Sequence, residues 1–353
     1  MKTELLSNHT QDLDPLSDPR WCHFVRSFKA ASVFHSQGWL QALHQTYGYK
    51  PVAFTATTAD GDLRGGLLFC RVESKLTGRR LVSLPFSDNC EPLISSLDDL
   101  RGLLEALKVV VGVEGYRYFE IRPFFVTVPD DCGLERSHRF WNHRLDLRPT
   151  TEELFSGFHK DCVQRKIHRA EREGLAYEEG RSTQLLRKFY SLQIITRRRQ
   201  QLPPQPFAWF QNLAQCMGEK LKVRVASKNG MPVASIITIQ HRNTLIYKYG
   251  CSDRALSNLG GTQFLFWKAI QDAKSQGLQE LDLGRSDWDN EGLIQFKDRL
   301  GATRSTLTYW RYPASSVAQT KDTWPMNVAK RVFSHLPSAC LSAAGNLLYR
   351  HVG

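Results

Sequence analysis

Apolar residues recur at helical spacing in three long stretches of the chain. After Ser36, the side chains of Trp39, Leu40 and Leu43 fall on one helical face. A second helix is expected from about residue 97, because two acidic residues precede a five-member apolar stripe and acids favour the positive end of a helix dipole. That stripe is Leu100, Leu103, Leu104, Leu107 and Val111. The third helix is expected over 261–276.

Short runs rich in β-formers lie between these helices. Asp60-Gly61 and Asn229-Gly230 each separate two such runs, and both dipeptides are strong signals for a β-hairpin turn. Further strands are expected over the ranges 81–86, 116–123, 244–250 and 278–286.

The second half of the chain repeats the order hairpin, strand, helix, strand of the first half. The offset is nearly constant: it is 169 residues between Gly61 and Gly230, and 162 between Phe119 and Leu281. This order predicts two copies of one α/β unit, although the order is common enough to arise by chance. We therefore expect a flexible leader over 1–20, one domain over 21–150, a second over 151–313 and a helical tail over 314–353.

Composition narrows the class of partner. The 353 residues carry 47 Lys and Arg against 35 Asp and Glu, a formal net charge of +12. Such an excess favours an anionic partner, for example coenzyme A, a nucleotide sugar, tRNA or anionic lipid headgroups. A merely basic surface is the equally weighted alternative. None of the eight cysteines forms a CxxC pair, so no zinc site is expected, and they are interpreted as buried thiols of a reducing compartment.

The ends of the chain bear on its location. The polar, acidic first 20 residues lack the pattern of a signal peptide, and no window of about 20 apolar residues occurs. We expect a cytoplasmic protein, with peripheral contact at the inner face of the membrane as an alternative. In the tail, apolar residues of 328–336 and 341–348 lie at helical spacing beside several cations. Such helices pack on the second domain or lie in a headgroup layer.

The segment after residue 244 contains the first candidate chemistry. Gly260, Gly261 and Thr262 fall where the third helix begins, and free backbone N–H groups at a helix start suit a phosphate or carboxylate. A tight turn is the alternative explanation for the paired glycines.

Several segments resemble one known family. The GGT-helix, the strand LDLGRS and the sequence GLIQFKDRLGA look like the C-terminal repeat of FemAB-like transferases, which have two acetyltransferase-like (GNAT) domains. The basic helix KDCVQRKIHRAEREGL resembles the start of the same repeat. In the first half, VFHSQGWLQALHQTYGYKP and KLTGRRLVSLPFSDNCEPL are similar to the subgroup associated with exopolysaccharide (exosortase) loci.

The resemblance implies an α+β fold with two tandem GNAT-like domains, each a mixed, mostly antiparallel sheet flanked by helices. It implies transfer of an acyl or aminoacyl group onto an amine of a cell-wall or exopolysaccharide precursor. The donor would be acyl-CoA or aminoacyl-tRNA, with no tightly bound cofactor, and the acceptor an anionic small molecule or a lipid-linked precursor. The chain lacks both the coiled-coil arm of some tRNA-using members and the usual pyrophosphate loop of acetyltransferases. A non-catalytic GNAT-like protein that binds a polyanionic glycan precursor or an assembly complex is the alternative.

The resemblance also assigns residues. It places Lys297 at the reaction centre, where a cation can stabilise an oxyanion, against the alternative of a surface lysine. Phe296 is assigned to packing or to the donor site.

The strand pattern adds further candidates. Asp282 alternates with two leucines, so it faces away from their side and is a candidate proton acceptor or a partner for Arg285. Arg285 and Asp287 are expected in a following loop, and Tyr249 is a candidate hydrogen-bonding residue whose alternative role is packing.

The basic helix supplies the remaining candidates for binding a donor. Arg165 and Arg169 lie one turn apart and could contact a phosphorylated donor, against the alternative of a solvated face.

Overall fold

The computed structural model describes residues 10–74, 77–313, 333 and 336–352. The chain divides into two compact units. The first unit comprises Met1–Arg139, Thr306–Lys321 and Leu347–Gly353, and the second comprises Phe140–Ser305 and Asp322–Asn346.

The first unit contains six strands in the order β1-β2-β3-β4-β5-β12. The pair β4–β5 is parallel, and the other neighbouring pairs are antiparallel. Its elements along the chain are β1 (Thr10–Leu13), α1 (Pro19–Ser27), η2 (Val33–His35), α2 (Gln37–Tyr47), β2 (Lys50–Thr57), β3 (Leu63–Ser74), β4 (Gly78–Val82), α3 (Leu97–Glu114), β5 (Phe119–Ile121) and η3 (Asp130–Cys132), with most of β12 (Thr303–Tyr312).

The second unit has the same arrangement, with strands in the order β7-β8-β9-β10-β11-β6. Again only the pair of the fourth and fifth strands, β10–β11, is parallel. Its elements are most of β6 (Glu135–Asp146), α4 (Thr151–Gly157), η4 (Lys160–Gln164), α5 (Arg165–Arg172), β7 (Ala176–Gly180), α6 (Thr183–Arg199), α7 (Phe207–Met217), η5 (Gly218–Lys220), β8 (Leu221–Lys228), β9 (Met231–His241), β10 (Thr244–Ser252), η6 (Arg254–Leu259), α8 (Gly261–Ser275), β11 (Glu280–Asp287) and α9 (Glu291–Arg299).

Each unit therefore has the order strand, two helices, three antiparallel strands, helix and strand. Each also receives a sixth strand from the other half of the chain: β6 follows β5 in sequence but pairs with β11, and β12 follows α9 but pairs with β5. The α+β fold with mixed, mostly antiparallel sheets is confirmed. The limits 21–150, 151–313 and 314–353 stay a prediction about domains, whereas the compact units divide after Arg139 because β6 changes unit along its length.

Local signals account for most of these elements. The Ser36 side chain accepts from the N–H of Trp39 at the start of α2, and the Ser96 side chain caps α3 in the same way. All five residues of the predicted α3 stripe are at most 5% exposed. Asn229 and Gly230 both have positive φ, 50° and 79°, as a two-residue hairpin of the I′ type requires.

Four local expectations differ from the structure. Within the predicted flexible leader, Thr10–Leu13 form β1 and pair with β2, while residues 1–9 lie outside the described part. The strand expected over 81–86 ends at Val82, since Leu84 and Phe86 adopt positive φ. The strand expected over 116–123 shortens to β5. The basic helix expected over 160–175 begins with the π-helical turn η4.

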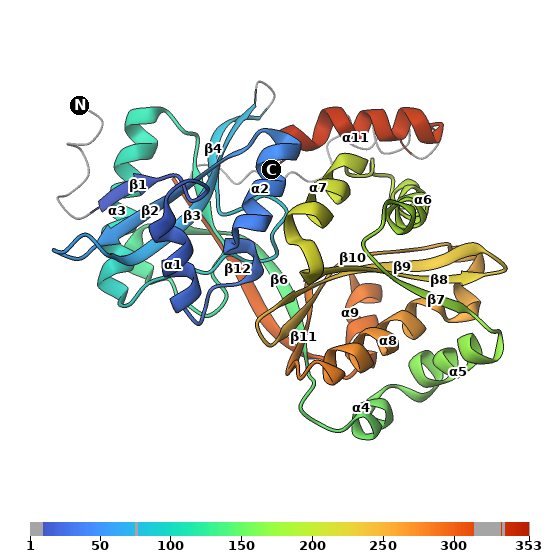
Figure 1. Ribbon diagram of the computed structural model, residues 1–353. Helices are drawn as coiled ribbons and strands as arrows, with labels where there is room; N and C mark the ends of the chain where they lie inside the picture. The colour runs from blue at the N-terminus through green and yellow to red at the C-terminus, as the bar shows by residue number, and fades with distance from the viewer. Residues whose placement is uncertain (1–9, 75–76, 314–332, 334–335, 353) are drawn as a thin grey trace. The chain divides into compact units, whose positions relative to one another are not determined.

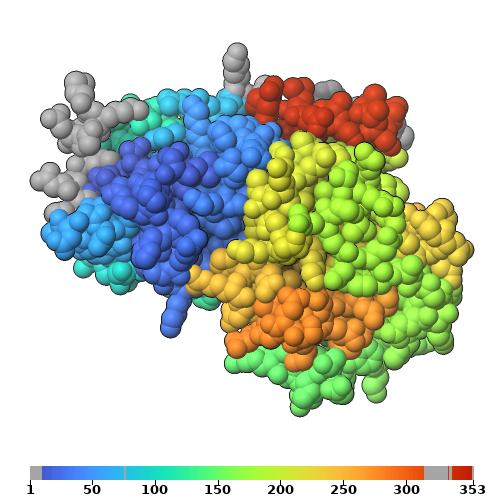
Figure 2. Space-filling view, viewed as in Figure 1, coloured from blue at the N-terminus to red at the C-terminus, as the bar shows by residue number. Residues whose placement is uncertain are grey.

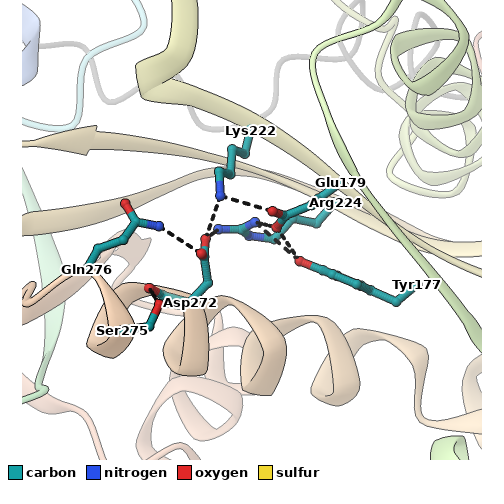
Figure 3. A network of polar contacts seen from close by, with 7 residues as sticks. All are labelled: Tyr177, Glu179, Lys222, Arg224, Asp272, Ser275 and Gln276. Carbon is teal, nitrogen blue, oxygen red and sulfur yellow. Dashed lines mark hydrogen bonds and ion pairs between the residues drawn. The ribbon is translucent and has the colours of Figure 1, made fainter.

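An ion network around the buried Arg224 joins the strands β7 and β8 to α8 (Figure 3). The Arg224 guanidinium is fully buried and donates to Glu179 and Asp272. Lys222 Nζ donates to the same two carboxylates at 3.0 and 2.9 Å. Burial would raise the pKa of Asp272, but the Lys222 hydrogen bond and the Arg224 charge lower it below its usual value. The network therefore fixes β7, β8 and α8 together without contributing a free charge.

The last described helix, α11 (Ser338–Val352), packs on α6 and α7 through its first half (Figures 1 and 2). Leu341 is fully buried, and a Cβ on Gly345 would come within 1.9 Å of the Pro204 carbonyl oxygen. Arg198 Nη2 donates to Ser338 Oγ at 2.9 Å. These contacts favour packing for this part of the tail, and nearly all of the predicted helix 328–336 lies outside the described residues.

Candidate active site

The parallel strands β10 and β11 pair over a short length and then separate. Their last paired residues are Ile246 and Asp282. Beyond that point β10 continues to Ser252 beside β9, and β11 continues to Asp287 beside β6. Backbone groups on the facing edges of the two strands are then not used for strand pairing between them, so an amide-bearing ligand can bind there. We take this divergence as the centre of the candidate site.

A bulge in β11 shapes one side of the divergence. The register of β11 against β6 shifts between Asp282 and Arg285. Gly284 lies at the shift with φ of 69°, and its N–H donates to Asp282 Oδ1 at 2.8 Å. An L side chain at position 284 would be strained at this φ, which explains the glycine.

Lys297 holds this bulge from α9. Its side chain is 1% exposed, and Nζ donates to the carbonyl oxygens of Gly284 and Arg285 at 2.9 Å each. The alternative of a surface lysine is therefore wrong. Phe296 packs on the hydrophobic core with its ring centroid 5.5 Å from that of Phe266, so its packing role is the one observed.

Asp282 lies on the opposite face of the sheet from its neighbouring leucines, as its alternation predicts. Leu281 and Leu283 belong to the core that includes α8. The Asp282 carboxylate is 7% exposed, and its Oδ2 lies 3.7 Å from Nη2 of Arg144, the residue directly across on β6. Asp282 and Arg144 thus form an ion pair across the two strands, and a pairing of Asp282 with Arg285 stays a prediction.

Two predicted loop residues belong to the strand. Arg285 and Asp287 lie in β11, not in a following loop, because pairing with β6 extends the strand. The Arg285 guanidinium lies over the ring of Phe140, 4.3 Å from its centroid.

Tyr249 lies on β10 beyond the divergence, after a register shift against β9. Its hydroxyl accepts a hydrogen bond of 2.8 Å from Trp209 Nε1, and its ring contacts Phe210 of α7 edge-on. These contacts agree with the packing role, and they fix the hydroxyl beside the diverging strands.

The paired glycines stand at the start of α8. Gly260 has φ of 79°, and a Cβ there would lie 2.1 Å from the carbonyl oxygen of Lys166 on α5. The close approach at Gly260 is therefore made by a neighbouring helix. The N-cap residue Gly260 has no side chain to cap α8, so the first-turn N–H groups at Gly261 and Thr262 suit an anion.

The same contact brings the basic helix α5 beside the start of α8. Arg165 Nη1 lies 2.9 Å from Asp161 Oδ1, and Arg169 Nε lies 3.9 Å from Glu173 Oε1. Both arginine side chains are largely exposed, as the solvated-face alternative predicts. Their positive charge is partly offset by acids one turn away.

Sequence reasoning assigned no role to β6, which carries two buried polar side chains beside the bulge. Asn142 is paired with Arg285 across the strands, is fully buried, and its amide makes no hydrogen bond to any described residue. His143 is also fully buried, with Nε2 3.4 Å from Asp298 Oδ1. Burial and then the Lys297 ammonium lower the pKa of His143 to about 4. The adjacent polar residues in an otherwise strand-like run were the available signal.

Two searches of the described residues add no further feature. No group of three or more His, Cys, Asp or Glu in the described part is arranged to hold a metal ion. Likewise, no described helix has the length and apolar character needed to cross a membrane.

Comparison with known proteins defines the class. Residues 157–297 match the family model of the acetyltransferase (GNAT) domain. Comparison with curated sequences gives no significant match.

Solved structures extend the likeness to most of the chain. It is similar to FemX, with a TM-score of 0.65, 13% identity, and 84% of this chain and 96% of that chain covered. For L-PGS from Bacillus licheniformis the TM-score is 0.54 and the identity 14%, with 92% of this chain and 98% of that chain covered. For a tandem GNAT protein from the clavulanic acid biosynthesis pathway the TM-score is 0.54 and the identity 10%, with 86% of this chain and 97% of that chain covered.

The second unit thus contains a GNAT acyltransferase domain. Over most of its length the chain has the fold of FemX and of a tandem GNAT protein, so the predicted double-GNAT fold is confirmed. Its place in the exopolysaccharide-associated subgroup stays a prediction.

Proposed function

We propose that this protein transfers an acyl or aminoacyl group from acyl-CoA or aminoacyl-tRNA to an amine of a cell-wall, lipid-linked or exopolysaccharide precursor. The observation that carries the proposal is the divergence of β10 and β11 beside a bulge that a buried lysine supports. The names of the similar proteins agree with it: they include FemX, L-PGS, and the C-terminal domain of a putative lysylphosphatidylglycerol synthetase.

In the proposed reaction the acceptor amine attacks the donor carbonyl directly. A new C–N bond forms, and the C–S bond of a thioester or the C–O bond of an ester breaks. The leaving thiolate or alkoxide takes up a proton. No covalent intermediate on the protein is required.

The residues of the second unit take different parts in this step. Asp282, whose carboxylate lies at the last pair of β10 and β11, accepts a proton from the attacking amine. Lys297 acts as a positioning residue, because two of its N–H groups are directed to the Gly284 and Arg285 carbonyls rather than into the gap. The uncapped start of α8 binds the phosphates of the donor, with α5 adding positive potential.

A thermal-shift panel tests the donor. The full chain is heated with acetyl-CoA and with aminoacyl-tRNA. Uncharged tRNA and adenosine diphosphate serve as controls. A ligand that binds only the folded state raises the melting temperature, by an amount that grows with its concentration. A shift with acetyl-CoA or with aminoacyl-tRNA supports the proposal. Absence of a shift with both donors would remove it and favour the non-catalytic alternative.

A further inference from the structure

A second site lies in the first unit, away from the elements used above. A pocket of about 450 Å³ forms where the end of α2, β2, β3 and the end of α11 meet. Its lining includes the aromatic rings of Tyr47 and Tyr49, which stack with centroids 5.5 Å apart. Three cations from three different elements line it as well: Lys50, Arg71 and Arg350.

The charges around this pocket do not cancel. Arg71 Nη2 lies 2.9 Å from Asp12 Oδ2, and the lining acid Glu73 lies 3.7 Å from Arg79 Nη2. Lys50 and Arg350 are exposed and form no ion pair with any residue that the structure describes. Among the described residues, Arg350 Nε lies within hydrogen-bond distance, 3.3 Å, of Nε2 of the neighbouring His351. Two cations thus remain to attract an anion.

The end of α11 that carries Arg350 is fixed by hydrogen bonds to its carbonyls. Tyr49 Oη donates to the Tyr349 carbonyl at 3.0 Å. Arg80 Nη2 and Thr77 Oγ1 donate to the His351 carbonyl at 2.8 and 3.1 Å. The C-terminal carbonyls of a helix need such donors. Arg350 is therefore presented from a fixed backbone and not from a free end.

An exposed apolar side chain lies one helical turn from Arg350. Leu347 is 57% exposed and precedes Arg350 by three residues, which places both on one face of α11. A cation one turn from an exposed leucine matches the boundary between phospholipid headgroups and acyl chains.

We propose that this pocket binds the phosphate of an anionic phospholipid headgroup. Lys50 and Arg350 contact the phosphate, Arg71 adds positive potential, and Leu347 enters the acyl boundary. A soluble phosphate compound shares the headgroup's chemistry, but it would not use Leu347. The proposal does not depend on which reaction the second unit catalyses.

The test is co-sedimentation of the full chain with phosphatidylcholine vesicles that do or do not contain phosphatidylglycerol. We expect binding only to the anionic vesicles. Lys50→Gln combined with Arg350→Gln should weaken it about 10- to 30-fold, since each basic residue near an anionic surface contributes roughly fivefold. The matched control is Lys220→Gln combined with Arg187→Gln, which removes the same charge from exposed sites in the second unit.

Two further arms identify the source of the phosphate. Leu347→Ser should weaken vesicle binding with the melting temperature unchanged. Inorganic phosphate at moderate concentration should compete only weakly with the vesicles. Equal losses in the two double variants would show that net charge alone attracts the membrane. Loss of affinity for inorganic phosphate in the pocket variant, without any vesicle binding by the natural chain, would assign the pocket to a soluble ligand instead.

Discussion

The two units place an acid and an arginine at the same position and use them differently. In the first unit Glu120 on β5 lies across from Arg311 on β12, and in the second Asp282 on β11 lies across from Arg144 on β6. Glu120 is also held by Arg122, so it has two arginines at 2.8 and 3.0 Å. Burial raises its pKa, but the two arginines lower it below the usual value overall.

The position two residues after the acid marks the main difference between the units. The first unit has Arg122 two residues after its acid, where the second has Gly284 after Asp282. Arg122 Nη1 donates to the Leu84 carbonyl at 2.7 Å, so the segment after β4 folds beside β5. In the second unit the Gly284 carbonyl in the bulge accepts a hydrogen bond from Lys297 Nζ. Beyond Ile246, β10 continues without pairing to β11. The first unit therefore has an ion network at this position. The second unit has a bulge there, beside strands that diverge.

The largest expected effect comes from removing one buried cation in each unit. Lys297→Met should reduce transfer by about 100-fold or more and abolish the donor-dependent thermal shift, because a displacement of about 1 Å at a reaction site has effects of that size. Arg122→Met, its matched control, should lower the melting temperature while transfer per folded molecule remains. Loss of transfer in both variants to the same degree would mean that Lys297 only stabilises the fold.

Replacing each of the two acids by its amide separates a catalytic role of the acid from a structural one. Asp282→Asn should lower kcat by about 100-fold with little change in donor binding, since general base catalysis contributes at least that much. Glu120→Gln leaves the half-buried Arg122 and Arg311 beside a neutral group and should destabilise the protein by about 3 kcal/mol without changing kcat. Urea unfolding and initial rates of the two variants measure this. A stability loss in Asp282→Asn as large as in Glu120→Gln would make both acids structural.

The pH dependence of stability provides a third test. The folded protein keeps His143 neutral down to about pH 4, whereas the unfolded chain protonates it near pH 6.5. The unfolded state therefore binds more protons in this window, and the free energy of unfolding should fall by up to about 3 kcal/mol as the pH drops from 6.5 to 4. His143→Gln should flatten that slope in urea titrations. An unchanged slope would assign the acid sensitivity to other groups.

The smallest effect is expected from the basic helix. Arg165→Gln combined with Arg169→Gln should weaken donor binding only about twofold to fivefold and reduce its salt dependence, because Asp161 and Glu173 already offset both charges. Binding measured at two salt concentrations gives the slope. An unchanged slope would place the donor phosphates on other cations.

Local patterns in the sequence predicted the features that depend on near neighbours. The stripe of α3, the capping serines and the Asn229-Gly230 turn each act within one helix turn or one hairpin, so their patterns predict the observed elements. The repeat was visible for the same reason, since each copy has the same local order. The adjacent Phe296 and Lys297 resemble a family motif, which singled out Lys297. The burial of Lys297 was not visible from the residues next to it in sequence.

The pairing of strands across the repeats, and the contacts of the candidate residues, followed from the packed fold and not from local patterns. The pairing of β6 with β11, the contact of Lys297 with the Gly284 carbonyl and the ion pair of Asp282 with Arg144 join residues whose separation in sequence has no periodic signature. Such contacts depend on the free energy of the whole packed sheet rather than on local propensity. For the same reason the shared acid–arginine pair, and the different uses of it in the two units, appeared only once the strands were placed side by side.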